Sequence, residues 1–475
     1  MKTAISLNIV TSFALLLVGC TSRGPYRITY PNALTGATPA PDPKKGDTRV
    51  VEDHGKYKLA FIEFDQVGKL QEGDKQIKAA EQVIRAARHL DLESGKKQSD
   101  TVGGLTILYI HGWKNNAQSI EGRKKDVEKF REALDRVATE LDFDLRKMPV
   151  TGVYIGWRGK SINVENDILN FWTLFPRYLV AGLVSTEDLQ KTVSRIINAG
   201  NAGRKDVPQE FRPRVILLGH SLGGRVLEGA VERAHGEGLF EEFHPASKNG
   251  LVLGTCVTLN QEDVPPTSGT GSAATATAET RGGPTAPVDL VLAVNEATRS
   301  FKVRRANKLC NPPADITKFV RHPGYDKAFC NVPANKNQAI CKPYPLFVHI
   351  ASKADWATRY LFLAALGGRT APHSVELHTH SVKEIQAEDD PPAGTVFTFQ
   401  TAGHEGDTTH HTYAVVNKKQ ELNRHPIWVM RVERPVIHNH GDIWNSDFTN
   451  MLMNLMGGLQ MVPMKRFSQE KLRMQ

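Results

Sequence analysis

Hydrophobic positions along this chain follow two patterns that alternate with one another. Apolar residues recur at helical spacing in residues 74–90, in residues 120–141 and in the segment that follows residue 221. Residues 105–110 and 215–218 are instead continuous apolar runs, which are typical of strands buried on both faces of a parallel sheet. Further strands are predicted at residues 58–64, 150–157, 250–259, 289–294, 345–351 and 426–432, and a closing helix at residues 448–455. This alternation predicts an α/β fold with a doubly wound, mostly parallel sheet.

Three stretches interrupt the alternation. Residues 168–184 are aromatic and apolar, which suits either a cap that walls an acyl pocket or touches lipid, or a plain core helix. Residues 265–287 are a low-complexity mixture of Ser, Thr, Ala and Gly, typical of a disordered surface loop. Residues 302–342 form a cysteine-bearing insertion, and the element boundaries within residues 373–423 do not follow from the pattern.

The first twenty residues have the features of an export signal. Lys2 is followed by an apolar stretch over residues 5–18, which ends at Leu-Val-Gly-Cys20 and resembles the lipobox of bacterial lipoproteins. That resemblance implies a signal peptide at residues 1–19 and acyl chains such as palmitate on Cys20, which would anchor the protein to a membrane. Thr21 stands where an inner-membrane retention aspartate would be, which favours the periplasmic face of the outer membrane. An ordinary secretory signal remains the alternative.

Composition refines the domain organisation. Residues 20–55 are rich in Pro, Gly, Thr and charge and predict a flexible tether. Residues 56–462 then form the α/β domain, and residues 463–475 form a basic tail. The net charge of +9 is spread along the 475 residues without a dense basic block, which argues against nucleic-acid binding.

Export also affects how the cysteines are interpreted. The four cysteines after Cys20 form an even set in an oxidising compartment, so disulfides are expected and three complete pairings are possible. Cys330 with Cys341 is the most local pair. A zinc site is less favoured, because no Cys-x-x-Cys spacing is present.

The chemistry of the chain centres on residues 219–223, Gly-His-Ser-Leu-Gly, which directly follow an apolar run. A Gly-x-Ser-x-Gly sequence between a strand and a helix is a nucleophile elbow, in which the serine lies on a tight turn and small residues leave room for it. Ser221 is therefore predicted to be a nucleophile. An acyl-transferring serine also needs a base, a carboxylate that orients the base, and donors for the oxyanion.

The acid and the base are expected to follow the serine in the chain. Asp355 comes just after the predicted strand at residues 345–351, on the edge where open α/β sheets place their sites. A helix N-cap is the alternative role for Asp355, and Glu296 is the alternative acid. His438 and His440 both follow the last strand and both qualify as the base. His378, His380, His404, His410 and His411 lack a spacing that fixes a metal geometry and are expected to be solvated loop residues.

These segments together resemble the α/β-hydrolase superfamily, and specifically bacterial esterases or lipase-like proteins with a His-Gly-(Trp/Phe)-x-Asn-(Asn/Ser) motif. The matching segments span residues 58–460 and include residues 109–116, 152–159, 219–225, 354–362 and 440–444. The His-Gly-Asp-Ile at His440 is similar to a His-x-Asp-Ile around the catalytic histidine of related hydrolases, which favours His440 over His438. The topology of this family assigns the oxyanion donors to the backbone N–H groups of Leu222 and Trp113, with His111 bonding locally.

The sequence therefore predicts a serine hydrolase that cleaves carboxylic esters, including lipid esters, without a metal or organic cofactor. Amides, thioesters and phospholipids remain open as substrates, because the triad serves all acyl transfers. A catalytically inactive hydrolase fold that acts as an envelope binding or scaffold lipoprotein is the alternative from another class.

Overall fold

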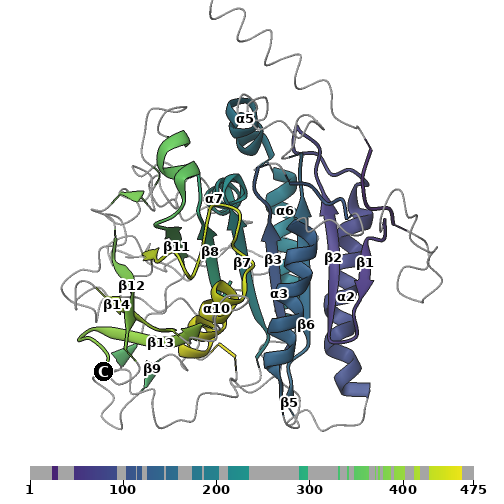
Figure 1. The fold of residues 1–475 in the computed structure, drawn as a ribbon. Coiled ribbons are helices and arrows are strands. Elements are labelled where there is room, and N and C mark those ends of the chain that lie inside the picture. Colours follow the sequence, from purple (N-terminus) through teal and green to yellow (C-terminus); the bar gives the residue numbers. More distant parts are fainter. Residues whose placement is uncertain are drawn as a thin grey trace, which may run out of the picture.

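A computed structural model describes most of the elements that the sequence predicts (Figure 1). The described residues are 24–29, 48–93, 103–113, 115–119, 126–143, 146–158, 174–184, 187–202, 212–234, 288–297, 330–331, 340–341, 347–362, 370, 373–374, 378–386, 390–401, 411–417, 427–459 and 461–462.

An 11-stranded sheet forms the centre of the described part, in the order β1-β2-β6-β3-β7-β8-β11-β15-β12-β14-β13. Neighbouring strands from β2 to β12 are parallel, whereas β1, β14 and β13 each pair antiparallel with a neighbour. The bounds are β1 Val51–Asp53, β2 Tyr57–Glu63, β3 Leu105–Ile110, β6 Val150–Gly156, β7 Arg214–His220, β8 Leu290–Val294, β11 Phe347–Ser352, β12 His380–Ile385, β13 Thr395–Thr401, β14 His411–Asn417 and β15 Ile427–Val432.

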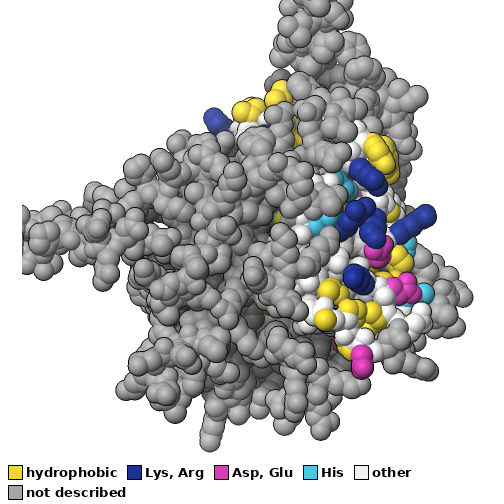
Figure 2. All heavy atoms as spheres, turned by 90° about the vertical axis from the view of Figure 1, so that its left-hand side faces the viewer, with side chains coloured by type: hydrophobic (Ala, Val, Ile, Leu, Met, Phe, Trp, Pro, Cys, Tyr) yellow, Lys and Arg dark blue, Asp and Glu magenta, His cyan; other side chains and the backbone are white. Residues whose placement is uncertain are grey.

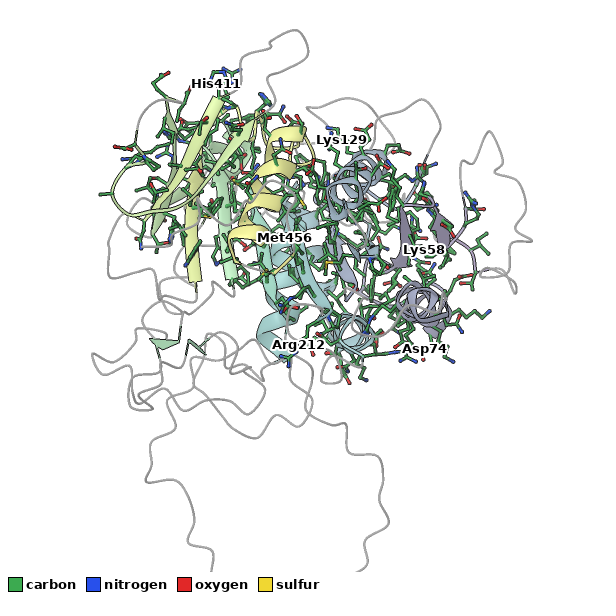
Figure 3. The ribbon with its side chains drawn as sticks, turned by 90° about the horizontal axis from the view of Figure 1, so that it is seen from below. Lys58, Asp74, Lys129, Arg212, His411 and Met456 are labelled. Carbon is green, nitrogen blue, oxygen red and sulfur yellow. The ribbon has the colours of Figure 1, made fainter. Side chains whose placement is uncertain are left out.

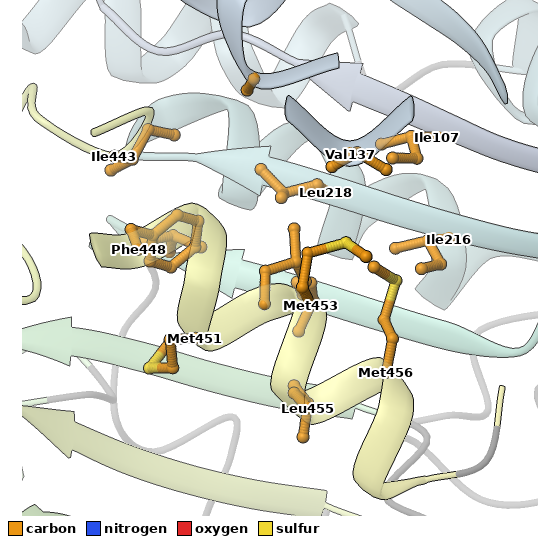
Figure 4. Close-up of a cluster of buried hydrophobic side chains, with 14 of the residues drawn as sticks. Ile107, Val137, Ile216, Leu218, Ile443, Phe448, Met451, Met453, Leu455 and Met456 are labelled. Atoms are coloured by element: carbon orange, nitrogen blue, oxygen red, sulfur yellow. The ribbon is translucent and has the colours of Figure 1, made fainter. Parts of the chain in front are cut away.

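Helices cover both faces of this sheet. The helices α2 (Asp74–Glu93), α5 (Leu174–Val184), α6 (Glu187–Gly200) and α7 (Leu222–Ala234) lie on one face, and α3 (Asp126–Leu141) and α10 (Ser446–Gly458) lie on the other. Seen from below, Asp74 of α2 and Lys129 of α3 lie on opposite sides of the strands (Figure 3). Met453 and Met456 of α10 pack toward Ile216 and Leu218 of β7 (Figure 4). Because both faces are buried, the central strands need continuous apolar runs, as β3 and β7 have.

The predicted α/β class and the mostly parallel sheet are confirmed. The predicted helix at residues 120–141 starts at Asp126 in the described residues, and α5 covers the second half of the apolar stretch at residues 168–184. The predicted strand at residues 250–259, the low-complexity loop at 265–287 and the basic tail at residues 463–475 lie outside the described residues.

The sequence pattern missed β12, β14 and β13, which extend the sheet beyond β15; β12 is parallel to β15, and β14 is antiparallel to both β12 and β13. β12 is partly polar and partly exposed, and β14 has only a short apolar run between polar residues, so neither has the long apolar run of β3 or β7. Figure 2 faces this side of the molecule, where Lys, Arg, Asp and Glu side chains lie among hydrophobic ones. Charge beside a sheet edge discourages pairing with another chain.

The tether prediction is wrong for the described residues before position 56. Arg27 is 0% exposed, and Ile28 forms a β-bridge with Arg49. Residues 51–53 pair with β2 as strand β1. Arg27 pairs with the buried Glu52 and bonds Glu63, which holds the residues around Arg27 on the domain.

Two short ladders lie apart from the main sheet. The first joins β4 (Asp142–Phe143) to β5 (Arg146–Lys147), and the second joins β9 (Cys330–Asn331) to β10 (Ile340–Cys341). Cys330 is directly opposite Cys341 in the second ladder. Opposed residues of an antiparallel pair have Cα atoms about 4.5–5.5 Å apart, within the range of a disulfide. The disulfide itself stays a prediction. Among the described helices, none is long and apolar enough to cross a membrane.

Candidate active site

Ser221 lies in a sharp turn between β7 and α7. Its φ is 55°, a conformation that residues other than glycine rarely adopt, and its N–H donates to the carbonyl of Val294 at 3.0 Å. A Cβ at Gly219 would lie 2.7 Å from the carbonyl oxygen of Gly223, and one at Gly223 would lie 2.2 Å from that of Ile110. The backbone packing therefore requires both glycines of the elbow, because no side chain fits at either position.

His440 lies on the loop between β15 and α10 and faces the serine. Its Nε2 is 2.7 Å from Ser221 Oγ, and its ring is 19% exposed. Two contacts shape the loop: Ser352 Oγ donates to the Ile437 carbonyl at 2.6 Å, and the Asn445 side chain caps α10 by accepting from the Phe448 N–H at 2.7 Å. A serine hydroxyl at this distance can donate its proton to the imidazole.

Asp355 follows β11 and orients the other nitrogen of the same ring. The Nδ1–H of His440 donates to Asp355 Oδ1 at 2.9 Å, and Oδ1 also accepts the backbone N–H groups of Ala357 (3.0 Å) and Thr358 (3.2 Å). Asp355 therefore contacts both His440 and the backbone of the first residues of the π-helical turn η7 (Ala357–Leu361), and its role as the catalytic acid stays a prediction.

The carboxyl group of Asp355 is fully buried but remains ionised. Burial by itself raises its pKa, yet the charge of His440, the nearby His373 ring and hydrogen bonds from His440 and Thr358 outweigh that effect and hold the pKa well below its usual range. The hydroxyl of Thr358 donates to Oδ2, and Nε2 of His373 donates to the same hydroxyl at 3.0 Å. Sequence patterns gave no sign of His373, because it reaches Asp355 only through the fold.

Two further residues hold the backbone of His440. Nε2 of His220 donates to the His440 carbonyl at 2.7 Å, and Nδ2 of Asn295 donates to the same oxygen at 3.2 Å. The amide oxygen of Asn295 in turn accepts the N–H of Ser352 at 2.9 Å. Sequence patterns gave no sign of either residue, although His220 ends β7 and Asn295 directly follows β8 at the carboxyl edge of the sheet.

The loop after β3 approaches the serine closely. A Cβ at Gly112 would lie 2.9 Å from Ser221 Cβ, so the backbone before Trp113 lies against Ser221. His111 shapes this loop: its Nδ1 donates to the Gly112 carbonyl at 2.9 Å, and its Nε2 accepts the Trp157 N–H at 3.0 Å. Burial lowers the pKa of His111 to about 4, so the ring stays neutral and bonds locally.

The two predicted oxyanion donors, Leu222 and Trp113, directly follow Ser221 and Gly112, two residues that lie against each other. Leu222 is the first residue of α7, where backbone N–H groups point away from the helix body, and Trp113 is partly buried against the apolar core. Their roles stay predictions.

The alternative residues from the sequence have other partners. His438 bonds Asp442 at 2.8 Å, and buried Glu296 bonds His349. Neither has a contact to Ser221 or His440 among the described interactions. His380 is buried and stacks on Trp428 at 3.9 Å, and His378 is also buried, so the expectation that these two are solvated is wrong.

His411 contacts Glu384 at 2.6 Å, while His404 and His410 lie outside the described residues. Within the described part of the chain, no group of three or more His, Cys, Asp and Glu residues could hold a metal ion. Cys20 lies outside the described residues as well.

Comparisons with known proteins give no relative: no family model matches this chain, and neither a curated protein nor a solved structure matches it.

Proposed function

We propose that this protein is a serine hydrolase of the α/β-hydrolase type that cleaves carboxylic esters. The observation that carries the proposal is the unbroken hydrogen-bond chain from Ser221 through His440 to Asp355, with distances of 2.7 Å and 2.9 Å. The serine follows β7, the acid follows β11 and the base follows β15, which is the chain order of that superfamily.

The residues suit acyl transfer in two halves. In the first, His440 Nε2 takes the proton of Ser221 Oγ while Oγ bonds to the ester carbonyl carbon. The backbone N–H groups of Leu222 and Trp113 bind the oxyanion, and the alcohol leaves with the proton from His440. In the second, a water gives its proton to His440 and attacks the acyl carbon. The bond to Oγ then breaks, and the proton returns to Ser221.

Asp355 supports both halves because it remains charged. Its carboxylate accepts the Nδ1–H of His440, which fixes the tautomer that has a free lone pair on Nε2. The same charge stabilises the imidazolium that forms in each half of the reaction.

A fluorophosphonate probe tests this proposal directly, because it labels only an activated serine. Purified full-length protein should react, and Ser221→Ala and His440→Ala should not. His438→Ala is the matched control: it removes a histidine from the same loop whose partner is Asp442, so labelling should persist. Folded protein that never reacts and never hydrolyses a short-chain nitrophenyl ester would refute the proposal in favour of a non-catalytic scaffold.

A further inference from the structure

Residues 24–29 are fixed at the carboxyl edge of the sheet. The backbone N–H of Arg27 donates to Glu63 Oε1 at 2.7 Å, and its guanidinium Nε donates to the Ala117 carbonyl at 2.9 Å. Glu63 ends β2, and Ala117 lies on the loop that follows β3. Three residues earlier, the carbonyl of Gly24 accepts a hydrogen bond from Arg158, which lies just beyond the end of β6.

This attachment is built from buried charge. Nη1 of Arg27 pairs with Glu52 at 2.8 Å, and both side chains are buried. The guanidinium also lies 3.6 Å above the centre of the Phe61 ring. Removal of such an ion from its partners is costly, so residues 24–29 follow the domain as one body.

The predicted lipid anchor is very close to this attachment in sequence. Cys20 lies four residues before Gly24. Each extended residue spans at most about 3.6 Å, so an acylated Cys20 stays within about 14 Å of the carboxyl edge. The membrane surface that holds the acyl chains must lie equally close.

The same edge carries the candidate active site. Ser221 and Asp355 follow the carboxyl ends of β7 and β11, which run parallel to β2, β3 and β6. A short anchor at this edge therefore turns the site toward the membrane rather than away from it.

Apolar side chains project from this edge. Four large ones are between 53% and 57% exposed: Leu179 and Leu183, one turn apart on α5, and Trp356 and Tyr360, which follow Asp355. The two segments meet where the Tyr178 and Phe362 rings lie 5.7 Å apart. Arg177 ties α5 to the end of β6 through a 2.7 Å bond to the Arg158 carbonyl, and Figure 1 shows α5 above the strand ends.

We propose that the bilayer carrying the Cys20 anchor covers this apolar edge, and that the substrates are carboxylic esters resident in the lipid layer. Leu179, Leu183, Trp356 and Tyr360 contact the acyl region, and a substrate reaches Ser221 from the membrane. The inference rests on acylation of Cys20 and on the proposed ester hydrolysis.

A linker insertion tests the orientation. About ten Gly and Ser residues placed between Ser22 and Arg23 add roughly 18 Å of flexible reach. In the control, the same linker is placed between Gly36 and Ala37, which lengthens the chain but leaves the span from Cys20 to Arg27 unchanged. Each full-length lipoprotein is reconstituted in phosphatidylcholine vesicles that contain a long-chain fluorogenic ester.

The Ser22 insertion should lower vesicle ester turnover at least about fivefold, whereas the Gly36 insertion should not. Both should hydrolyse a soluble short-chain ester at the unmodified rate. Equal vesicle turnover in all three proteins would overturn the inference while leaving the proposed function intact.

Fluorescence gives a readout that does not depend on activity. The difference in tryptophan fluorescence between the unmodified protein and Trp356→Phe gives the emission of Trp356. Brominated phospholipid should quench this emission, and the Ser22 insertion should remove most of the quenching. Quenching without any hydrolysis would support the orientation and refute the ester hydrolase. Unquenched Trp356, a self-associated chain covering this face, or an unacylated Cys20 in mass spectrometry would each overturn the inference.

Discussion

Nε2 of His220 donates a 2.7 Å hydrogen bond to the backbone carbonyl of His440, so the residue before Ser221 holds the backbone of the histidine that contacts Ser221. Burial, and then the nearby charge of His440, lower the pKa of His220 to about 3. The ring is therefore neutral at every pH at which an esterase would be assayed. A neutral imidazole carries one N–H. In His220 that hydrogen must be on Nε2, because the His440 carbonyl oxygen can only accept a hydrogen bond.

His220→Ala should lower kcat about fivefold with little change in KM, because the alignment of His440 loses one hydrogen bond worth about 1 kcal/mol. His220→Gln, whose amide N–H occupies a similar place, should recover most of kcat. Steady-state kinetics on a soluble ester check both variants. Equal losses in the two variants, or a loss that appears in KM alone, would argue against a positioning role.

Gly223→Ala should destabilise the fold, because the new Cβ would lie 2.2 Å and 2.4 Å from the carbonyl oxygens of Ile110 and His111. We expect the free energy of unfolding to fall by about 3 kcal/mol. Gly182→Ala in α5 is the control: its Cβ would meet only Arg225 at 3.5 Å, and alanine should stabilise the helix by up to about 1 kcal/mol. Urea unfolding followed by circular dichroism measures both, and similar values for the two variants would contradict the prediction.

Asp126 should make stability fall as the pH rises. Burial raises the pKa of Asp126 to about 6 despite hydrogen bonds from Tyr154 (2.9 Å) and Tyr109 (3.0 Å). Between about pH 4 and pH 6 the folded state therefore holds a proton that the unfolded state has released, and ionisation costs about 3 kcal/mol by pH 7.

Asp126→Asn should remove that part of the pH dependence. The free energy of unfolding of the unmodified protein should fall between pH 4 and pH 8, and that of the variant should fall by less. Urea unfolding of both proteins at each pH measures the difference. Parallel pH profiles of the two proteins would mean that Asp126 does not titrate in this range.

Arg27→Ala should destabilise the protein by about 3–5 kcal/mol, because it leaves Glu52 buried without one of its cations. Burial raises the pKa of Glu52, but bonds from His54, Arg27 and Arg131 outweigh this and lower it. Lys191→Ala removes an exposed partner of Glu187 and should leave the unfolding midpoint unchanged. Limited proteolysis should cut the N-terminal segment faster in Arg27→Ala alone.

A disulfide should join Cys330 to Cys341. Their ladder positions are opposite each other, and closure of this short loop should stabilise the oxidised form by about 3 kcal/mol. Peptide mass mapping without reductant should find the two residues in one linked fragment. A link from either residue to Cys256 or Cys310 would show a different pairing.

The sequence determined the elements whose signal is local. Continuous apolar runs predicted β3 and β7 because strands buried on both faces admit few polar side chains. Likewise, glycines on either side of Ser221 predicted the elbow, since the turn has no room for larger residues. Chain order then restricted the acid and the base to a few positions, of which the structure brings Asp355 and His440 to the serine.

Only the tertiary structure decided what depends on partners distant in the chain. His438 and His440 share a loop, and they differ because Asp442 bonds the first while Asp355 reaches the second. No residue near Arg27 in the sequence shows that Arg27 will bond Glu63 and Ala117. Its segment was therefore predicted to be a flexible tether, although the described residues 24–29 are fixed on the domain. A local sequence pattern reflects the backbone conformation that residues prefer and whether their side chains are buried. Ion pairs and hydrogen bonds between separate strands, in contrast, form only once the sheet has assembled.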